Sequence, residues 1–231
     1  DVFLDVVRGL GDRAREAGAG VVGGDLSAGE KLVISITAFG YCPGPVVRRD
    51  GACPGDLVAV SGTLGYSYAG LDLLEGGHVD PSARGEAQLG DLAPFVDTYR
   101  APRPPLGSGV AAAAAGARAM MDLSDGPATD AARIAKASGV VIEFDREAIE
   151  AEASHLAPAA RVCAVDPVRW VLQGGEEHGM IAVFPPDAQL PDGFRVVGSV
   201  RACLAEEEPR AMMDGAVLRG AWDHFSADSV D

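Results

Sequence analysis

Three oxygen-bearing side chains, Asp122, Ser124 and Asp125, lie together at the end of an apolar segment. Pro127 follows, which suits the first position of a helix, and Gly139 supplies a stop for that helix. Carboxylates hold Mg²⁺ while leaving it waters and phosphates as further ligands, and free N–H groups at a helix N-terminus bind phosphate oxygens. The segment therefore indicates a metal and phosphate site, with a plain turn and helix cap as the alternative.

Two other segments place glycines directly before acids. Gly24 and Asp25 follow a predicted short strand at 19–22, and Gly174-Gly175 precede Glu176 and Glu177. Glycine lets the backbone come close to a ligand, whereas an ordinary turn is the alternative reading. Arg49 lies in a turn-rich loop, where an arginine pair is commonly a solvated surface and otherwise a phosphate contact.

The composition of the 231 residues excludes several classes of partner. A net charge of −15 argues against nucleic acid and anionic membranes, because both need a basic face. No apolar run reaches the length of a membrane span, and no signal segment is present. The four cysteines have no CxxC pairing, which favours reduced thiols and a cytoplasmic protein. No P-loop or GxGxxG pattern occurs, and the chain opens at Asp1 within a helix pattern, as a piece lacking its upstream part would.

The elements that position these residues alternate between strands and helices, which predicts an α/β or α+β fold. Residues 76–105 are the least regular part, and their prolines make this the natural place for a domain boundary. Strands are expected at 19–22, 31–39, 57–60, 140–144, 180–184 and 195–200, helices at 3–18, 66–74, 107–117, 127–138 and 147–153, and a hairpin turn at 213–216.

Taken in order, the motifs resemble the thiamine-monophosphate kinase family, which belongs to the ATP-binding superfamily that includes aminoimidazole ribonucleotide synthetase. The matching segments span nearly the whole chain and are Gly23–Asp25, Arg49–Asp56, Arg100–Pro105, Asp122–Gly126, Ser138–Val140, Gly174–His178 and Gly220–Phe225. The resemblance implies a two-domain fold of mixed sheets covered by helices. Residues 1–105 would be the remainder of an incomplete N-terminal ATP- and metal-binding domain, and residues 106–231 a C-terminal α+β domain.

The resemblance also implies an activity. Such a kinase moves the γ-phosphoryl group of ATP directly onto the phosphate of thiamine monophosphate with the help of Mg²⁺, and works as a homodimer. The implied ATP contacts are Gly24, Asp25, Arg49 and Ser124, the metal ligands are Asp25, Asp122 and Asp125, and the substrate contacts are Glu176 or Glu177 together with Trp222.

Three positions depart from the family pattern. Leu26 stands where a threonine is common, Pro127 replaces a leucine, and Glu177-His178 replaces an Asp-Tyr pair, which shifts substrate contacts at that loop. The family also has upstream metal-binding acids and a sheet used in dimerisation, so a molecule that starts at Asp1 is expected to be weak or inactive. The alternatives are another ATP-dependent enzyme of the superfamily, a non-catalytic nucleotide-binding or dimerisation module, and a metal-independent structural domain.

Overall fold

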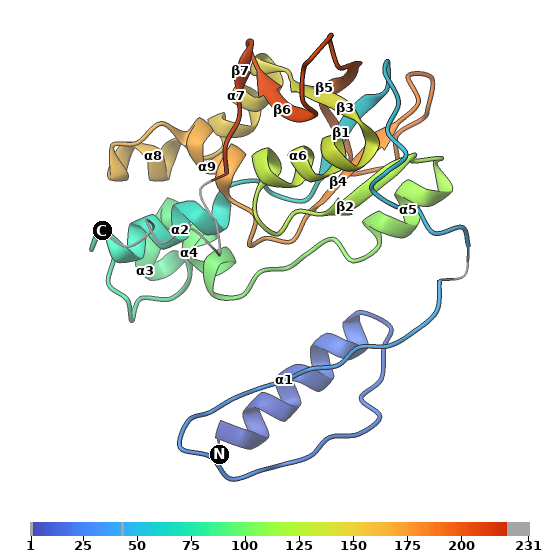
Figure 1. The fold of residues 1–231 in the computed structure, drawn as a ribbon. Helices are drawn as coiled ribbons and strands as arrows, with labels where there is room; N and C mark the ends of the chain where they lie inside the picture. Colours follow the sequence, from blue (N-terminus) through green and yellow to red (C-terminus); the bar gives the residue numbers. More distant parts are fainter. Residues whose placement is uncertain (1, 43, 221–231) are drawn as a thin grey trace. The chain divides into compact units, whose positions relative to one another are not determined.

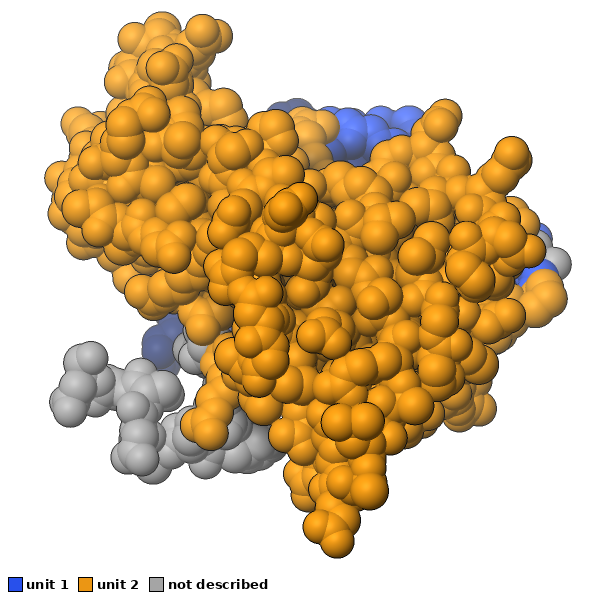
Figure 2. Space-filling model, turned by 90° about the horizontal axis from the view of Figure 1, so that it is seen from above, with its two compact units in different colours: residues 1–44 blue, residues 45–231 orange. Residues whose placement is uncertain are grey.

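The computed structural model describes residues 2–42 and 44–220 and contains two compact units, Asp1–Gly44 and Pro45–Asp231, which Figure 2 distinguishes by colour. We call them unit 1 and unit 2. Among its described residues unit 1 contains one helix, α1 (Val2–Glu16), which confirms the helix predicted from the apolar spacing at 3–10.

The two strands predicted in unit 1 are wrong, because residues 19–22 and 31–39 form neither helix nor strand. Leu32, Ile34 and Ile36, the apolar face of the second predicted strand, are each more than half exposed. Alternation of apolar and polar residues shows which face a strand would bury. A strand also needs a neighbour for its N–H and C=O groups, and the described part of unit 1 offers none.

Unit 2 is built on one mixed sheet of seven strands in the order β2-β4-β1-β5-β3-β6-β7 (Figure 1). β3 and β6 pair in parallel, and the other neighbours are antiparallel. The strands predicted at 57–60, 140–144, 180–184 and 195–200 and the turn at 213–216 are confirmed. The strands are β1 (Leu57–Ser61), β2 (Ala119–Asp122), β3 (Val140–Phe144), β4 (Met180–Phe184), β5 (Arg195–Ala202), β6 (Arg210–Met213) and β7 (Ala216–Val217).

The helices of unit 2 include four that were predicted, at 66–74, 107–117, 127–138 and 147–153. The irregular segment 76–105 and the segment after residue 154 hold further short helices. Pro94, Pro158 and Pro167 each lie in the first turn of one of them, where proline starts a helix rather than breaking it. The helices are α2 (Tyr66–Glu75), α3 (Gly85–Leu89), the 3₁₀ helix η1 (Gly90–Leu92), α4 (Ala93–Arg100), α5 (Ser108–Ala114), α6 (Pro127–Ser138), α7 (Arg146–Ser154), α8 (Ala157–Cys163) and α9 (Pro167–Gln173).

The sheet buries both of its faces. Val58 and Val60 of β1 point into the main core, which includes Ile134 of α6, and α6 crosses this side of the sheet (Figure 1). Ala59, the residue between them, belongs to a smaller cluster on the other face with Ala112 of α5. The two-residue period of a strand explains this division. Because β1 shares a sheet with strands beyond residue 106, the sheet crosses the predicted domain boundary; the division into 1–105 and 106–231 stays a prediction.

Two further observations concern the chain as a whole. All four cysteines are free, in agreement with the expectation of reduced thiols. Within residues 2–42 and 44–220, none of the helices combines the length and the apolar character needed to cross a membrane.

Candidate functional site

The segments 122–126 and 174–179 meet at one end of the sheet, although about fifty residues separate them in the sequence. β2 ends where β4 begins, because the strands are antiparallel and Asp122 lies opposite Met180. The N–H of Leu123 continues this pairing by donating to the carbonyl oxygen of Gly179 at 2.8 Å. The fold therefore brings together two of the predicted site segments.

Glycines let these two segments touch backbone to backbone. A Cβ atom on Gly175 would lie 2.4 Å from the backbone nitrogen of Gly126 and 2.6 Å from the carbonyl oxygen of Ser124. A Cβ atom on Gly126 would lie 2.7 Å from the carbonyl carbon of Gln173, and Gly126 has a φ of 95°, which side chains rarely adopt. The glycines next to the acids thus serve close packing of the loops.

The turn at Ser124 and Asp125 is held from inside by Asp130, a residue that the sequence interpretation missed. One carboxylate oxygen of Asp130 accepts from the N–H groups of Ser124 and Asp125 at 3.0 and 3.1 Å. Its other oxygen accepts from Arg133 at 2.7 Å, and Arg133 also forms an ion pair of 2.5 Å with Asp125. Burial raises the pKa of the Asp130 carboxyl, and the hydrogen bonds and the charge of Arg133 oppose that rise.

Asp122 and Asp125 are the predicted metal ligands in unit 2. Asp122 ends β2 and is exposed, whereas Asp125 is partly buried against Arg133. In the described part of the chain, no group of three or more His, Cys, Asp or Glu side chains is placed to hold a metal ion. The two carboxylates still fit a Mg²⁺ that takes its remaining ligands from phosphates and water. Gly24 and Asp25 belong to unit 1, where both are exposed.

The structure gives the two neighbouring acids, Glu176 and Glu177, different environments. Glu177 is only 5% exposed, and its carboxylate accepts from the N–H of Ser67 at 2.9 Å, at the start of α2. It therefore caps a helix whose own N-cap, Gly65, has no side chain. Burial raises the pKa of Glu177, and backbone N–H groups that donate to it act in the opposite direction. The Glu176 side chain is 75% exposed, and its carboxylate lies 4.0 Å from Nε2 of His178.

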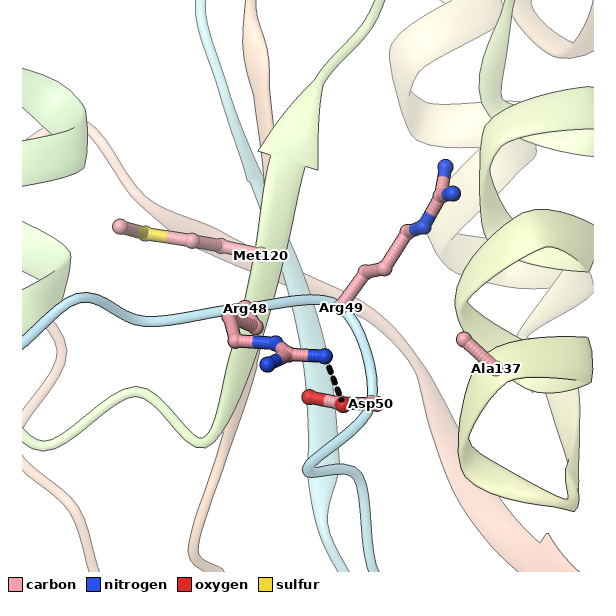
Figure 3. A pocket seen from close by; sticks show the side chains of 5 residues that line it. All are labelled: Arg48, Arg49, Asp50, Met120 and Ala137. Atoms are coloured by element: carbon pink, nitrogen blue, oxygen red, sulfur yellow. Dashed lines mark ion pairs between the residues drawn. The ribbon is translucent and has the colours of Figure 1, made fainter.

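Arg49 lines a hollow of about 510 Å³ with Arg48, Asp50, Met120 and Ala137 (Figure 3). Arg48 forms an ion pair with Asp50 at 2.8 Å, while the Arg49 side chain extends toward α6. Ala137 lies ten residues after Pro127, the start of α6, which is about 15 Å along the helix axis at 1.5 Å per residue. The fold therefore places the Arg49 hollow near the opposite end of α6 from Asp125.

A second hollow, of about 420 Å³, lies between α6 and residues 218–220. Three basic side chains line it: Arg133, Lys136 and Arg219. Trp222, the predicted contact to the thiamine part, follows this segment but lies outside the described residues.

Comparison with known proteins gives consistent relatives, although no family model matches the chain. The chain is 39% identical over 223 residues to the thiamine-monophosphate kinase of Mycobacterium tuberculosis (strain CDC 1551 / Oshkosh), covering 95% of this chain and 62% of the relative. It is 41% identical over 204 residues to the thiamine-monophosphate kinase of Corynebacterium glutamicum, covering 87% of this chain and 59% of the relative. It is 31% identical over 233 residues to the thiamine-monophosphate kinase of Halobacterium salinarum, covering 97% of this chain and 72% of the relative. The chain thus spans about three fifths of the length of the first two relatives.

A solved structure, AaThiL complexed with AMPPCP and TMP, has the same fold. It superposes with a TM-score of 0.61 at 28% identity and covers 78% of this chain and 54% of that one. The resemblance in sequence and the likeness in structure therefore agree, and both extend over most of the chain.

Proposed function

Because the chain belongs to the thiamine-monophosphate kinase family, we propose that it transfers the γ-phosphoryl group of ATP to the phosphate of thiamine monophosphate. The products are thiamine diphosphate and ADP. The observation that carries the proposal is the contact between the Ser124–Gly126 turn and the Gly175 loop, which brings the metal-side acids and the substrate-side acid to one end of the sheet.

The residue types suit a reaction between two anions. Donor and acceptor phosphates repel each other unless positive charge lies between them, so charge neutralisation and alignment are most of what phosphoryl transfer needs. Asp122 and Asp125 are the residues that would hold Mg²⁺, which supplies that charge when it is bound. Ser124, between them, is the proposed contact to ATP. No nucleophile from the protein is needed, because an oxygen of the acceptor phosphate attacks the γ-phosphorus directly.

Glu176 is the proposed contact to thiamine monophosphate. Its side chain is exposed, it follows Gly175, which packs against the Ser124–Gly126 turn, and its carboxylate offers negative charge to the positively charged thiazolium ring. Glu177 supports the proposed substrate contact indirectly. Its carboxylate holds the loop that contains Glu176 against the N-terminus of α2.

The remaining assignments rest on the family resemblance. They are Gly24 and Asp25 as contacts to ATP and metal, Arg49 as a contact to the ATP phosphates, Trp222 as the residue that packs on thiamine, and assembly as a homodimer. An Arg49 contact requires a nucleotide that extends along α6, since the hollow lies toward the C-terminal end of that helix.

The test is to incubate the chain with ATP, Mg²⁺ and thiamine monophosphate and to quantify thiamine diphosphate and ADP. The two products are expected in equal amounts, formed slowly if the molecule starts at Asp1, and Asp125→Asn is expected to abolish them. Nucleotide binding without product would support the non-catalytic module instead. ATP consumption without binding of thiamine phosphates would support another enzyme of the superfamily. Absence of both binding and product would overturn the proposal.

A further inference from the structure

We propose that Asp130 is a positioning residue of the site, which fixes the Ser124–Asp125 turn directly and the Asp125 carboxylate through Arg133. The inference rests on the proposed function, because it takes Ser124 and Asp125 as the residues that face nucleotide and metal.

Asp130 is fully buried and has no exposed surface, yet both of its oxygens have partners. One oxygen accepts from two consecutive backbone N–H groups, those of Ser124 and Asp125. The other accepts from Arg133, which lies one turn further along α6 and is partly exposed. This arrangement resists change, because moving the turn would leave one buried oxygen of the Asp130 carboxylate without its two N–H donors.

The consequence for Asp125 follows from the same contacts. With its backbone N–H directed inward to Asp130, Asp125 is held at a fixed place in the turn. Arg133 bridges Asp130 and the Asp125 carboxylate, so it also limits the directions in which that carboxylate points. The turn also packs closely against Gly175, where a Cβ atom would lie 2.4 Å from the backbone nitrogen of Gly126. Replacing a group that orients a metal ligand typically lowers metal affinity about 10- to 100-fold.

Asp56 provides a matched comparison. It is 1% exposed, accepts from the N–H of Cys53 at 2.9 Å, and pairs with Arg118 at 2.7 Å. It thus combines burial, a turn N–H and an arginine just as Asp130 does, but it holds a turn outside the proposed metal site. A purely structural role for Asp130 would make the two aspartates equivalent.

The experiment compares Asp130→Ala with Asp56→Ala in the same chain. Both variants are measured at a temperature below the midpoint of their thermal unfolding. Calorimetry gives the Kd of the non-hydrolysable ATP analogue AMPPCP with Mg²⁺ and with EDTA. In Asp130→Ala the gain in affinity due to Mg²⁺ is expected to fall about 10- to 100-fold, the range for outer-shell partners of metal ligands. Binding in EDTA reports on the Ser124 contact without metal and should weaken less than the Mg²⁺-dependent gain does. Asp56→Ala should keep the gain within about twofold of wild type.

An Asp130→Ala variant that keeps the Mg²⁺-dependent gain, or an Asp56→Ala variant that loses it equally, overturns the inference. If Asp130→Ala does not fold, Asp130→Asn replaces it. The amide oxygen still accepts from the turn, but Arg133 loses its ion pair with residue 130 and keeps only the one with Asp125. A smaller loss of the gain is therefore expected, and no loss overturns the inference. A wild-type chain that neither binds AMPPCP with Mg²⁺ nor forms product overturns the proposed function as well, which separates the two failures.

Discussion

Replacing Gly175 by alanine tests whether the two loops of the site must touch. The added Cβ would lie 2.4 Å from a backbone nitrogen and 2.6 Å from a backbone carbonyl oxygen, whereas ordinary contacts begin at 3.4 Å. The loops must therefore separate by about 1 Å, and no side-chain rotation relieves the clash because both neighbours are backbone atoms. Gly175 is not at a positive φ, so alanine itself is not disfavoured there.

The expected costs follow from that displacement. Overpacking of this kind destabilises by about 1–3 kcal/mol, and a misplacement of about 1 Å in a site costs about 100-fold in rate. Urea unfolding gives the first quantity, and kcat for thiamine diphosphate formation gives the second. Gly107→Ala is the control, because its Cβ would meet nothing within 4 Å and its φ is −82°.

Two outcomes would refute the reasoning at different points. If Gly175→Ala keeps both its stability and its rate at the level of Gly107→Ala, the loops do not touch as described. If stability falls but kcat does not, the contact is real but does not position the reacting groups. Only a loss of both stability and kcat supports the link between the packing of the two loops and the proposed reaction.

The remaining predictions concern individual charges. Glu176→Gln is expected to raise KM for thiamine monophosphate about tenfold, because the attraction between the carboxylate and the positive thiazolium ring is lost, with unchanged stability; steady-state kinetics and urea unfolding check this. Glu177→Gln should leave KM unchanged, and an increase in KM there would reverse the two assignments. Because burial raises the folded-state pKa of Glu177, its contribution to stability is fully present below the unfolded value of about 4.3 and is lost as pH rises through the folded pKa. Glu177→Gln should flatten that decline in urea unfolding series above pH 4, and an unchanged slope would contradict the assignment. Arg49→Ala should weaken AMPPCP binding about tenfold in calorimetry, whereas Arg48→Ala, which removes a residue paired with Asp50, should weaken it less.

The strands and helices of unit 2 could be predicted from the sequence because their signals are local. Alternating apolar residues and a proline at a helix start act within a few residues, and α6 begins at Pro127 and stops at Gly139 as those residues predict. The segment 31–39 carries an equally clear local signal, but whether it becomes a strand depends on a partner strand. The prolines between 76 and 105 are ambiguous for a different reason, since proline both prevents the continuation of one helix and favours the start of the next.

The role of Asp130 could not be predicted from its position. An aspartate in the first turn of a helix is expected there for its interaction with the helix dipole, and nothing in the sequence distinguishes it from a solvated one. Its proposed role depends on two N–H groups five and six residues earlier, and Gly126, which has a φ of 95°, connects their turn to the helix that carries Asp130.

The pair Glu176-Glu177 shows where sequence interpretation of a site ends. Two identical side chains in adjacent positions are equivalent to any argument from residue type and spacing, so the resemblance to the family leaves both open. Their difference is created by Ser67, which is 110 positions away in the sequence and presents its N–H at the start of α2 to one of the two carboxylates. Since one acid is used to join the loop to that helix, the other keeps an exposed side chain. The fold, rather than the motif, therefore creates the difference on which the proposed role of Glu176 rests.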